Sequence, residues 1–207
     1  MKKIILFLLI TSTSVFAKKT CIDQISVKFG TDLSSKYEYI GTQKYFTDET
    51  EGKSYDFSVE ALKLIDDKFK VGLGISYQKH NNRKFYKYNP TLTTFGMEYD
   101  SIPIYGTLNY NINYKDLTLY LKANLGYSFN INSSDLRFNS LKLDSSSENG
   151  LYTAFGGGIE YNDFFVELMY GITRSKIKVK YNNKLFNFKE SNDYKRVTLS
   201  VGYNFNI

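Results

Sequence analysis

The sequence has very few of the residues on which most enzyme and metal chemistry depends. Its 207 residues contain one cysteine, one histidine and no tryptophan. A single cysteine excludes an internal disulfide framework and a zinc site built from several cysteines, and a single histidine removes most histidine-dependent catalysis. No apolar run of about 18 residues is present, which excludes a membrane-spanning helix. We therefore expect no catalytic residues, no cofactor and no metal site.

Aromatic residues are abundant by contrast. The chain has 19 tyrosines and 16 phenylalanines but only 2 prolines, a composition that favours strands over helices. The formal net charge is +6, from 27 basic and 21 acidic residues. This excess is mild, and nucleic acid is not an expected partner, because the N-terminus described next indicates export from the cytoplasm.

The N-terminus indicates export from the cytoplasm. Lys2 and Lys3 precede an apolar segment, Ile4 to Ile10, and the small residue Ala17 closes a cleavage signature. These features predict a cleaved signal peptide over residues 1–17 and one mature domain over residues 18–207. The mature protein is then secreted, periplasmic or located in the outer membrane.

After the signal peptide, apolar and polar residues alternate with period two. In Leu117 to Ile131 every second residue is apolar, and the residues between are mostly polar or glycine. Such alternation predicts strands with one apolar face. Eight runs of this kind are found: Ile25–Leu33, Ser54–Leu64, Phe69–Lys79, Ile102–Ile112, Leu117–Ile131, Leu151–Tyr161, Phe164–Arg174 and Tyr194–Ile207.

The lengths of the runs and connections predict the architecture. Most runs are longer than an average globular strand of about 5 to 6 residues and match the 9 to 11 or so that cross a bilayer. Short turns at Asp66-Asp67, Lys115-Asp116 and Asn162-Asp163 alternate with long polar loops at residues 34–53, 80–101, 132–150 and 175–193. This layout predicts an all-β, eight-stranded antiparallel up-and-down transmembrane β-barrel with short periplasmic turns, long extracellular loops and both termini periplasmic.

The composition of the polar face indicates which side points outward. A soluble barrel would expose that face to water, but it carries many glycines, which weaken a solvated strand. Inside a narrow barrel, glycines instead make room for larger lumen side chains. Aromatic residues on the apolar face also gather near the strand ends, as they do at the two bilayer interfaces. We therefore expect lipid against the apolar face and a polar lumen.

The pattern of strands and loops, together with the C-terminal residues, resembles a known family of proteins. The chain is similar to small bacterial outer-membrane barrels of the class that contains the OmpA transmembrane domain, OmpX and opacity-type surface proteins. Its last eight residues, from Ser200, resemble the C-terminal signal that such barrels present to the outer-membrane assembly machinery, with Gly202, Tyr203, Phe205 and Ile207 at the matching positions. The resemblance implies an outer-membrane location, contact with membrane lipid including lipopolysaccharide, and recognition by that machinery.

Four charged residues on the polar face are predicted to form a lumen network: Lys28, Glu60, Lys122 and Glu167. Counting from the turns places them at similar height, and a pairing register with residue numbers summing to about 88 would set Lys28 opposite Glu60. Lys122 could reach Glu167 past the small residues Gly156–Gly158. A charge in a constricted interior is costly unless it is paired, so two acids and two bases should neutralise each other. The network is either structural filler or a gate in a narrow channel.

Other charges lie toward the loops. Asp32 and Arg196 are predicted to form an upper lumen pair. Arg83, Lys84 and Lys87 alternate with aromatic residues in the second loop and are candidates for binding polyanions, either lipopolysaccharide phosphates or anionic host glycans. A solvated rim with incidental charge is the alternative.

His80 is the one position that suggests a membrane-edge hydrolase. It is followed by Asn81-Asn82, and no carboxylate is evident beside it, so we interpret it as a solvated loop histidine. The function favoured by the sequence is a non-enzymatic surface protein whose loops mediate adhesion or envelope interaction, with host surface molecules among the partners. The alternative is a narrow, porin-like channel for small solutes.

Overall fold

A computed structural model of the chain describes residues 21–38, 49–83, 86–89, 92–95, 98–138, 141–180 and 188–207. The signal peptide predicted over residues 1–17 lies outside these ranges. Within the described residues, no helix has the length and apolar character that a membrane crossing requires.

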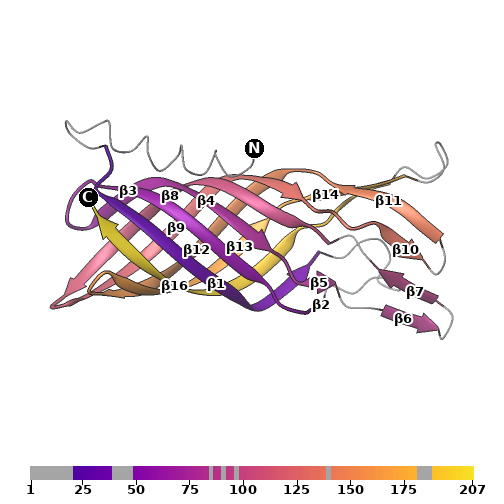
Figure 1. Cartoon of the computed structure of the whole chain (residues 1–207), viewed down its shortest axis with the longest axis horizontal. Helices are drawn as coiled ribbons and strands as arrows, with labels where there is room; N and C mark the ends of the chain where they lie inside the picture. The colour runs from indigo at the N-terminus through magenta and orange to yellow at the C-terminus, as the bar shows by residue number, and fades with distance from the viewer. Residues whose placement is uncertain are drawn as a thin grey trace, which may run out of the picture.

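Eight antiparallel strands close into a barrel, in which each strand is tilted and paired with its neighbours (Figure 1). Around the barrel the order is β1-β16-β13-β12-β9-β8-β4-β3. The strands are β1 (Gln24–Tyr37), β3 (Tyr55–Leu64), β4 (Phe69–Lys79), β8 (Asp100–Tyr114), β9 (Leu117–Ile131), β12 (Gly150–Tyr161), β13 (Phe164–Thr173) and β16 (Tyr194–Asn206). The predicted fold class is confirmed.

The strand bounds agree with the predicted runs to within two residues, except at the end of β1, where a bulge interrupts the alternation. Strand β9 covers the predicted run residue for residue. Strand β1 instead continues beyond Leu33 to Tyr37, and its register against β16 shifts between Asp32 and Ser34. A bulge of one residue exchanges the inward and outward positions. Period-two alternation therefore ends at Leu33, although the strand does not.

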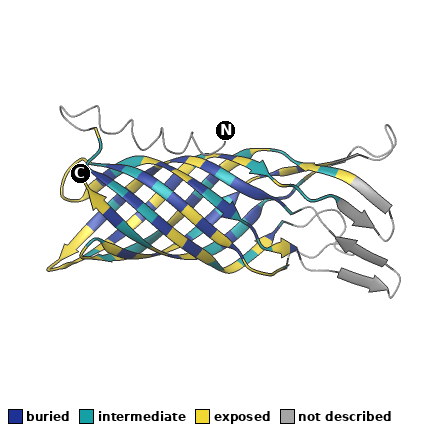
Figure 2. Cartoon of the chain, viewed as in Figure 1, coloured by how far each residue is buried: buried dark blue, intermediate teal, exposed yellow. Residues whose placement is uncertain are grey.

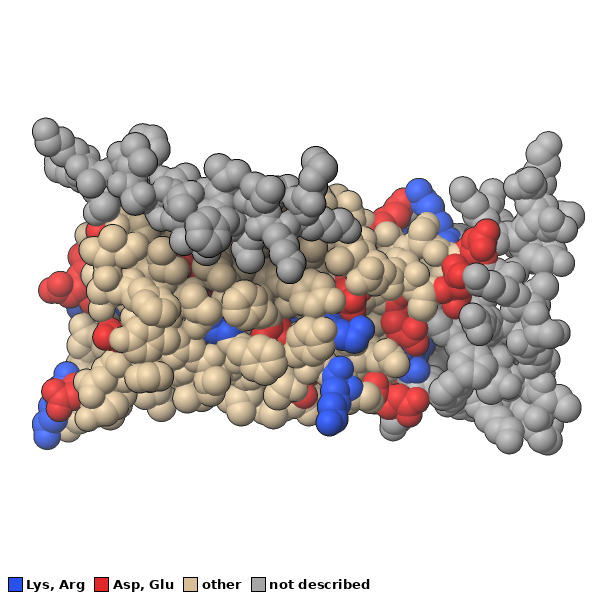
Figure 3. Space-filling model, viewed as in Figure 1, with Lys and Arg blue, Asp and Glu red and all other residues tan. Residues whose placement is uncertain are grey.

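The barrel is apolar outside and polar inside, as the composition of the two faces predicts. On β9, Leu121 is 60% exposed whereas its neighbour Lys122 is 5% exposed. Figure 2 shows the resulting chequered pattern of more buried and more exposed residues on the barrel. On the face seen in Figure 3, charged side chains concentrate toward the two ends, with a mostly uncharged wall between them. This wall is the surface that the hydrocarbon of a bilayer would cover.

Glycines in the wall stand opposite the largest lumen side chains. Gly158 pairs with Tyr120, Gly74 pairs with Tyr105, and each tyrosine ring lies over its glycine. A Cβ atom at Gly158 would lie 2.5 Å from the Tyr120 hydroxyl oxygen and would also collide with the carbonyl of Val166. The glycines therefore determine where aromatic rings fit in the narrow interior.

Replacing Gly158 by alanine is expected to destabilise the barrel by about 1–3 kcal/mol, because the new methyl group meets backbone that cannot move without disturbing β13. The matched control is Gly106→Ala, since a Cβ at Gly106 meets its nearest heavy atom at 3.8 Å. Urea unfolding of both variants in lipid vesicles measures the difference. Equal losses in the two variants would contradict this account of the glycines.

Beyond one end of the barrel, parts of the predicted loops form further strands. Strands β6 (Tyr86–Asn89), β7 (Leu92–Phe95), β10 (Leu136–Phe138), β11 (Leu141–Ser147), β14 (Lys176–Lys180) and β15 (Phe188–Ser191) form a six-stranded sheet, and β2 (Thr50–Glu51) pairs with β5 (Asn82–Arg83). In Figure 1 this extension lies at the end opposite the C-terminus. The sequence predicted long polar loops here and left their conformation open; the structure shows that parts of them continue as short strands.

Candidate functional site

Four buried charges meet in the middle of the lumen. Lys28 Nζ lies 2.5 Å from Glu167 Oε1 and 3.2 Å from Glu60 Oε1. Lys122 Nζ lies 2.6 Å from Glu60 Oε2 and 3.0 Å from Glu167 Oε2. Each lysine thus contacts both glutamates, and the four side chains, at most 6% exposed, form a closed ring of alternating charge. We call these four residues the lumen quartet.

The register of β1 against β3, which brings Lys28 near Glu60, differs from the predicted one. Residue numbers across β1 and β3 sum to 86, so Glu60 pairs with Ser26 and Lys28 pairs with Ser58. Lys28 still reaches Glu60 because the lysine side chain spans the offset of two residues. Across β12, Gly156 pairs with Lys122 and Gly158 with Glu167, which leaves the two charged side chains free to meet over the glycines.

Two tyrosines complete the hydrogen bonding of the quartet. The Tyr105 hydroxyl donates to Glu60 Oε1 at 2.9 Å, and the Tyr120 hydroxyl donates to Glu167 Oε2 at 3.2 Å. Buried carboxylates need such donors, because their remaining lone pairs are otherwise unsatisfied. No role was predicted for these tyrosines, although each faces inward opposite a glycine.

A second charged group lies nearer the loops. Arg196 lies 3.5 Å from Asp32 Oδ1, as the predicted upper pair requires, but its shorter contact is with Asp56 Oδ2 at 2.7 Å. Asp56 also accepts hydrogen bonds from Ser58 and Ser76. Asp56 was not among the predicted residues; it lies inward on β3 and meets Arg196 only because the sheet closes between β1 and β16.

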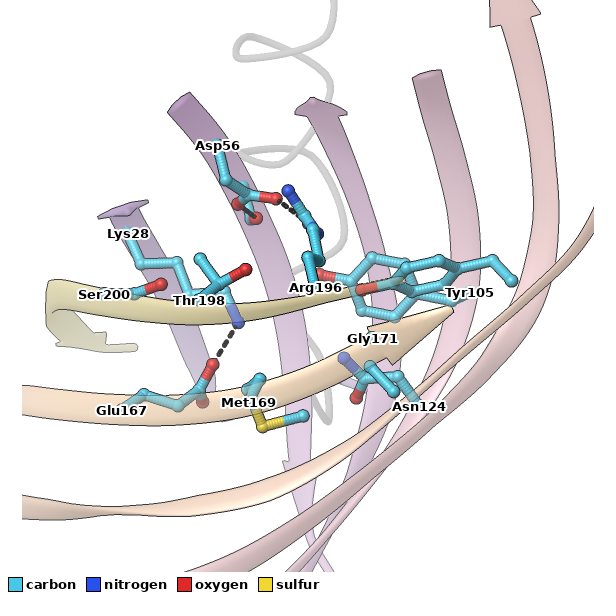
Figure 4. A pocket seen from close by; sticks show the side chains of 13 residues that line it. Lys28, Asp56, Tyr105, Asn124, Glu167, Met169, Gly171, Arg196, Thr198 and Ser200 are labelled. Carbon is cyan, nitrogen blue, oxygen red and sulfur yellow. Dashed lines mark hydrogen bonds and ion pairs between the residues drawn. The ribbon is translucent and has the colours of Figure 1, made fainter. Parts of the chain in front are cut away.

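Between the quartet and Arg196 lies a cavity of about 20 Å³, large enough for a single water molecule. Figure 4 shows Lys28, Glu167, Asp56 and Arg196 around it, with the Lys28–Glu167 and Asp56–Arg196 contacts drawn. A smaller cavity of about 10 Å³ lies on the other side of the quartet and is lined in part by Glu60 and Lys122. The quartet therefore separates two water-sized spaces.

The structure removes Arg83 from the predicted polyanion-binding group. Its side chain is buried, its guanidinium donates to Asn192 Oδ1 at 2.6 Å and to the carbonyl of Glu38, and it lies over the ring of Tyr37. Arg83 is therefore part of the packing at the base of the loops. Lys84 and the side chain of Lys87 lie outside the described residues.

His80 was wrongly interpreted as a solvated residue. It is 2% exposed, and its imidazole stacks on the ring of Tyr194 with centroids 3.9 Å apart. Tyr99 meets it edge-on at 4.9 Å. The polar face of β4 continues one residue past the strand end and turns His80 inward. Within the described part of the chain, no three histidine, cysteine, aspartate or glutamate side chains are grouped so as to hold a metal ion.

The residues of the predicted C-terminal assembly signal lie at the end of β16, with Ile207 one residue beyond the strand. Phe205 and Ile207 are exposed on the outer face, and the ring of Tyr203 packs against Phe164 at 4.8 Å. Gly202 points inward opposite Phe165. This places three apolar side chains on the outer surface, where another protein could contact them, and recognition by the assembly machinery stays a prediction.

A closed barrel with an apolar outer wall, a polar lumen and short turns at one end is the fold of the small outer-membrane β-barrels. No family model matches the chain. It is 29% identical over 236 residues to the uncharacterized protein PM1543 of Pasteurella multocida strain Pm70, a match that covers 99% of this chain and 98% of that protein.

Two solved structures have a similar fold. The outer membrane protein OprG of Pseudomonas aeruginosa superposes with a TM-score of 0.57 at 13% identity, covering 90% of this chain and 97% of OprG. The outer membrane protein AlkL, determined in lipid bilayers, superposes with a TM-score of 0.52 at 13% identity, covering 92% of this chain and 95% of AlkL. At such identities the similarity shows the fold.

Proposed function

We propose that this chain is a non-enzymatic surface protein of the bacterial outer membrane, anchored by the barrel and acting through the part beyond the rim. The observation that carries the proposal is the obstructed lumen: the quartet fills its middle, and Tyr37, His80, Tyr99 and Tyr194 pack across its outer end. A barrel filled in this way is suited to anchoring. The strands that extend past the rim enlarge the surface presented outside the cell (Figure 1).

The orientation follows from the same proposal. Gln24 and Asn206, at the two ends of the barrel sequence, are paired, and Asn206 donates a hydrogen bond to Asp163 in one of the short turns, so both ends lie on the side of the short turns. They would face the periplasm, where the assembly machinery would contact the end of β16. The apolar wall would contact membrane lipid, including lipopolysaccharide in the outer leaflet, and the extension would meet host surface molecules or neighbouring envelope components.

The surroundings of His80 support a role other than catalysis. Its ring is enclosed between aromatic neighbours, and among the described residues no serine or carboxylate forms a hydrogen bond with either ring nitrogen. A histidine that acts as a general base needs such a partner within hydrogen-bond reach.

Adhesion is tested with bacteria that display the full-length protein. We expect the double substitution Lys84→Gln and Lys87→Gln to reduce binding to heparin-coated surfaces several-fold, because fewer cations would attract the polyanion. Arg83 is kept, since it packs at the loop base. The matched control, Lys68→Gln with Lys115→Gln, removes the same charge at the short turns and should not change binding. Equal binding by all three proteins would refute adhesion through this loop.

A narrow channel is the second candidate, favoured by the two water-sized cavities on either side of the quartet. In planar bilayers the native protein would then show discrete conductance, and Glu167→Ala would raise it by removing part of the obstruction. Silence of both proteins would eliminate transport and leave the surface role in place.

A further inference from the structure

Four aromatic rings form a closed layer at the outer end of the lumen, and we call them the mouth cluster: Tyr37, His80, Tyr99 and Tyr194. The Tyr37 and Tyr194 centroids are 4.9 Å apart, and those of Tyr37 and Tyr99 are 6.0 Å apart. Stacking of His80 on Tyr194 and its edge contact with Tyr99 complete the layer. None of the four residues is more than 2% exposed.

The mouth cluster joins the bases of different loops. The Tyr99 hydroxyl donates to the carbonyls of Thr173 at 3.2 Å and Asn192 at 3.1 Å. The Tyr194 hydroxyl accepts from the Asn81 amide at 3.1 Å and donates to Asp32 Oδ2 at 2.8 Å. Opening the cluster would therefore loosen segments that emerge from β1, β4, β8, β13 and β16 together.

The end of β4 is the part of this arrangement with the poorest hydrogen bonding. Within the described residues, neither ring nitrogen of His80 has a hydrogen-bond partner, and the same is true of both amide atoms of Gln78 and of Asn81 Oδ1. Buried polar atoms without partners are rare in proteins, and each costs free energy. So many unpaired atoms within four residues indicate a segment that gains hydrogen bonds when it meets water.

The charges around His80 oppose its protonation. Lys79 precedes it, and Arg196 faces it from β16, while Arg83 lies over the ring of Tyr37, 4.5 Å from the ring centroid. Three acids on the segments that form the mouth cluster are engaged with other groups. Asp32 accepts from Tyr194, Arg196 and Thr198; Asp100 accepts from Tyr77 and Asn132 and pairs with Lys79; and Asp193 accepts from Ser175 and Ser191.

Burial, and then the positive charges of Arg196 and Lys79, hold the pKa of His80 well below its usual value. A histidine whose pKa is lowered in one state stabilises that state fully above the ordinary pKa of about 6.5. This stabilisation is lost as the pH falls toward the lowered pKa. The closed mouth is therefore the form of neutral pH, and acid favours any form in which His80 reaches water.

We infer that the mouth cluster is an acid-sensitive closure, in which protonation of His80 releases its ring from Tyr194 and Tyr99 and opens the outer end of the lumen to water. Gln78 and Asn81 then hydrogen-bond to solvent together with the imidazolium. The barrel below, held by the quartet, stays closed. This closure goes beyond the proposed surface role, because it controls how the loop bases are held rather than what they bind.

The experiment uses the single histidine as its own probe. The full-length protein, labelled with ¹³C-histidine and folded in detergent micelles, gives NMR ring signals from His80 alone. At pH 7.5 we expect these signals to be protected from broadening by a soluble gadolinium chelate. On acidification they should become exposed, with a midpoint clearly below pH 6.5 or so, and the open-to-closed ratio should rise by up to about tenfold per pH unit.

The variant His80→Phe separates histidine from the nearby carboxylates, because it keeps an aromatic ring on Tyr194 but cannot take up a proton. Its Asn81 and Tyr194 amides should stay protected from hydrogen exchange at the pH that exposes them in the native protein. An acid transition of equal size in this variant would assign the effect to Asp32, Asp100 or Asp193 and overturn the inference.

The titration of the native protein decides the question even where the variant does not fold. A His80 signal that titrates near pH 6.5, or one that stays protected after it has titrated, would also overturn the inference. Unheated samples incubated at pH 7.5 and at the acid endpoint are run on denaturing gels, where the mobility shows whether the barrel is still folded. This measurement distinguishes opening of the mouth from loss of the whole fold.

Discussion

Replacing Lys122 by methionine is expected to lower the free energy of unfolding by about 3–5 kcal/mol, the usual effect of removing one partner from a buried ion pair. Methionine matches the length of lysine, so the loss measures charge more than volume. Without Lys122, the buried carboxylates of Glu60 and Glu167 share only Lys28. One negative charge is then buried without compensation.

Two further variants test that explanation. Adding Glu167→Gln to Lys122→Met leaves one acid and one base, Glu60 and Lys28, at 3.2 Å, and should restore much of the lost stability. Lys63→Met breaks the 2.8 Å pair with Asp23, whose side chains are 43% and 31% exposed, and should have a much smaller effect, since solvent already screens that pair. Chemical unfolding in vesicles measures all three. A double variant less stable than Lys122→Met would contradict charge balance as the role of the quartet.

The sequence was most informative where the barrel wall is regular. Strict alternation defined β9 completely, and the contrast of glycine with apolar residues indicated the orientation of the wall, because a strand has only two faces. The bulge in β1 shows the limit of this reasoning. It exchanges the two faces after Leu33, so that Tyr37 turns inward against the pattern, and nothing in the alternation signals where such an exchange occurs.

The candidate site was predictable in its members and less so in its contacts. The face of the strand on which each residue lies and its distance from the short turns identified the charges of the quartet. Few charged residues occupy inward positions near the middle of a strand. The register of β1 against β3 was wrong by two residues, since a shift of two keeps the same residues facing outward and the long segment that joins these strands leaves the register open. Asp56 was missed because its partner Arg196 lies at the other end of the chain and only barrel closure brings them together.

His80 illustrates a different difficulty. A polar residue beyond the end of a strand and next to two asparagines has the composition of a loop. Its burial depends on Tyr99 and Tyr194, which are close to it only in the closed barrel. The aromatic layer is thus a property of tertiary structure, and a single sequence carries no periodic signal for it.

Replacing Leu73 by arginine is expected to destabilise the protein in lipid vesicles by about 2–4 kcal/mol, the cost of a cation on the lipid face of a barrel near the bilayer midplane. Leu73 is 70% exposed and lies on the outer face of β4 midway between Phe69 and Tyr77, which belong to the two aromatic ends of the wall. The same change on the surface of a water-soluble protein would shift stability by no more than about 0.5 kcal/mol.

The destabilisation caused by an outward arginine depends on its depth in the bilayer, and this dependence provides a matched control. Ile65 is 62% exposed but lies in the short turn after β3, so Ile65→Arg places the same side chain where headgroups and water can solvate it. Its cost should fall to about 0–1 kcal/mol. Unfolding titrations of both variants in vesicles, compared with the native protein, measure the difference. Equal stability of the two variants would mean that hydrocarbon does not cover the apolar wall, and the outer-membrane role would then fail with it, because an anchor of this kind depends on that contact.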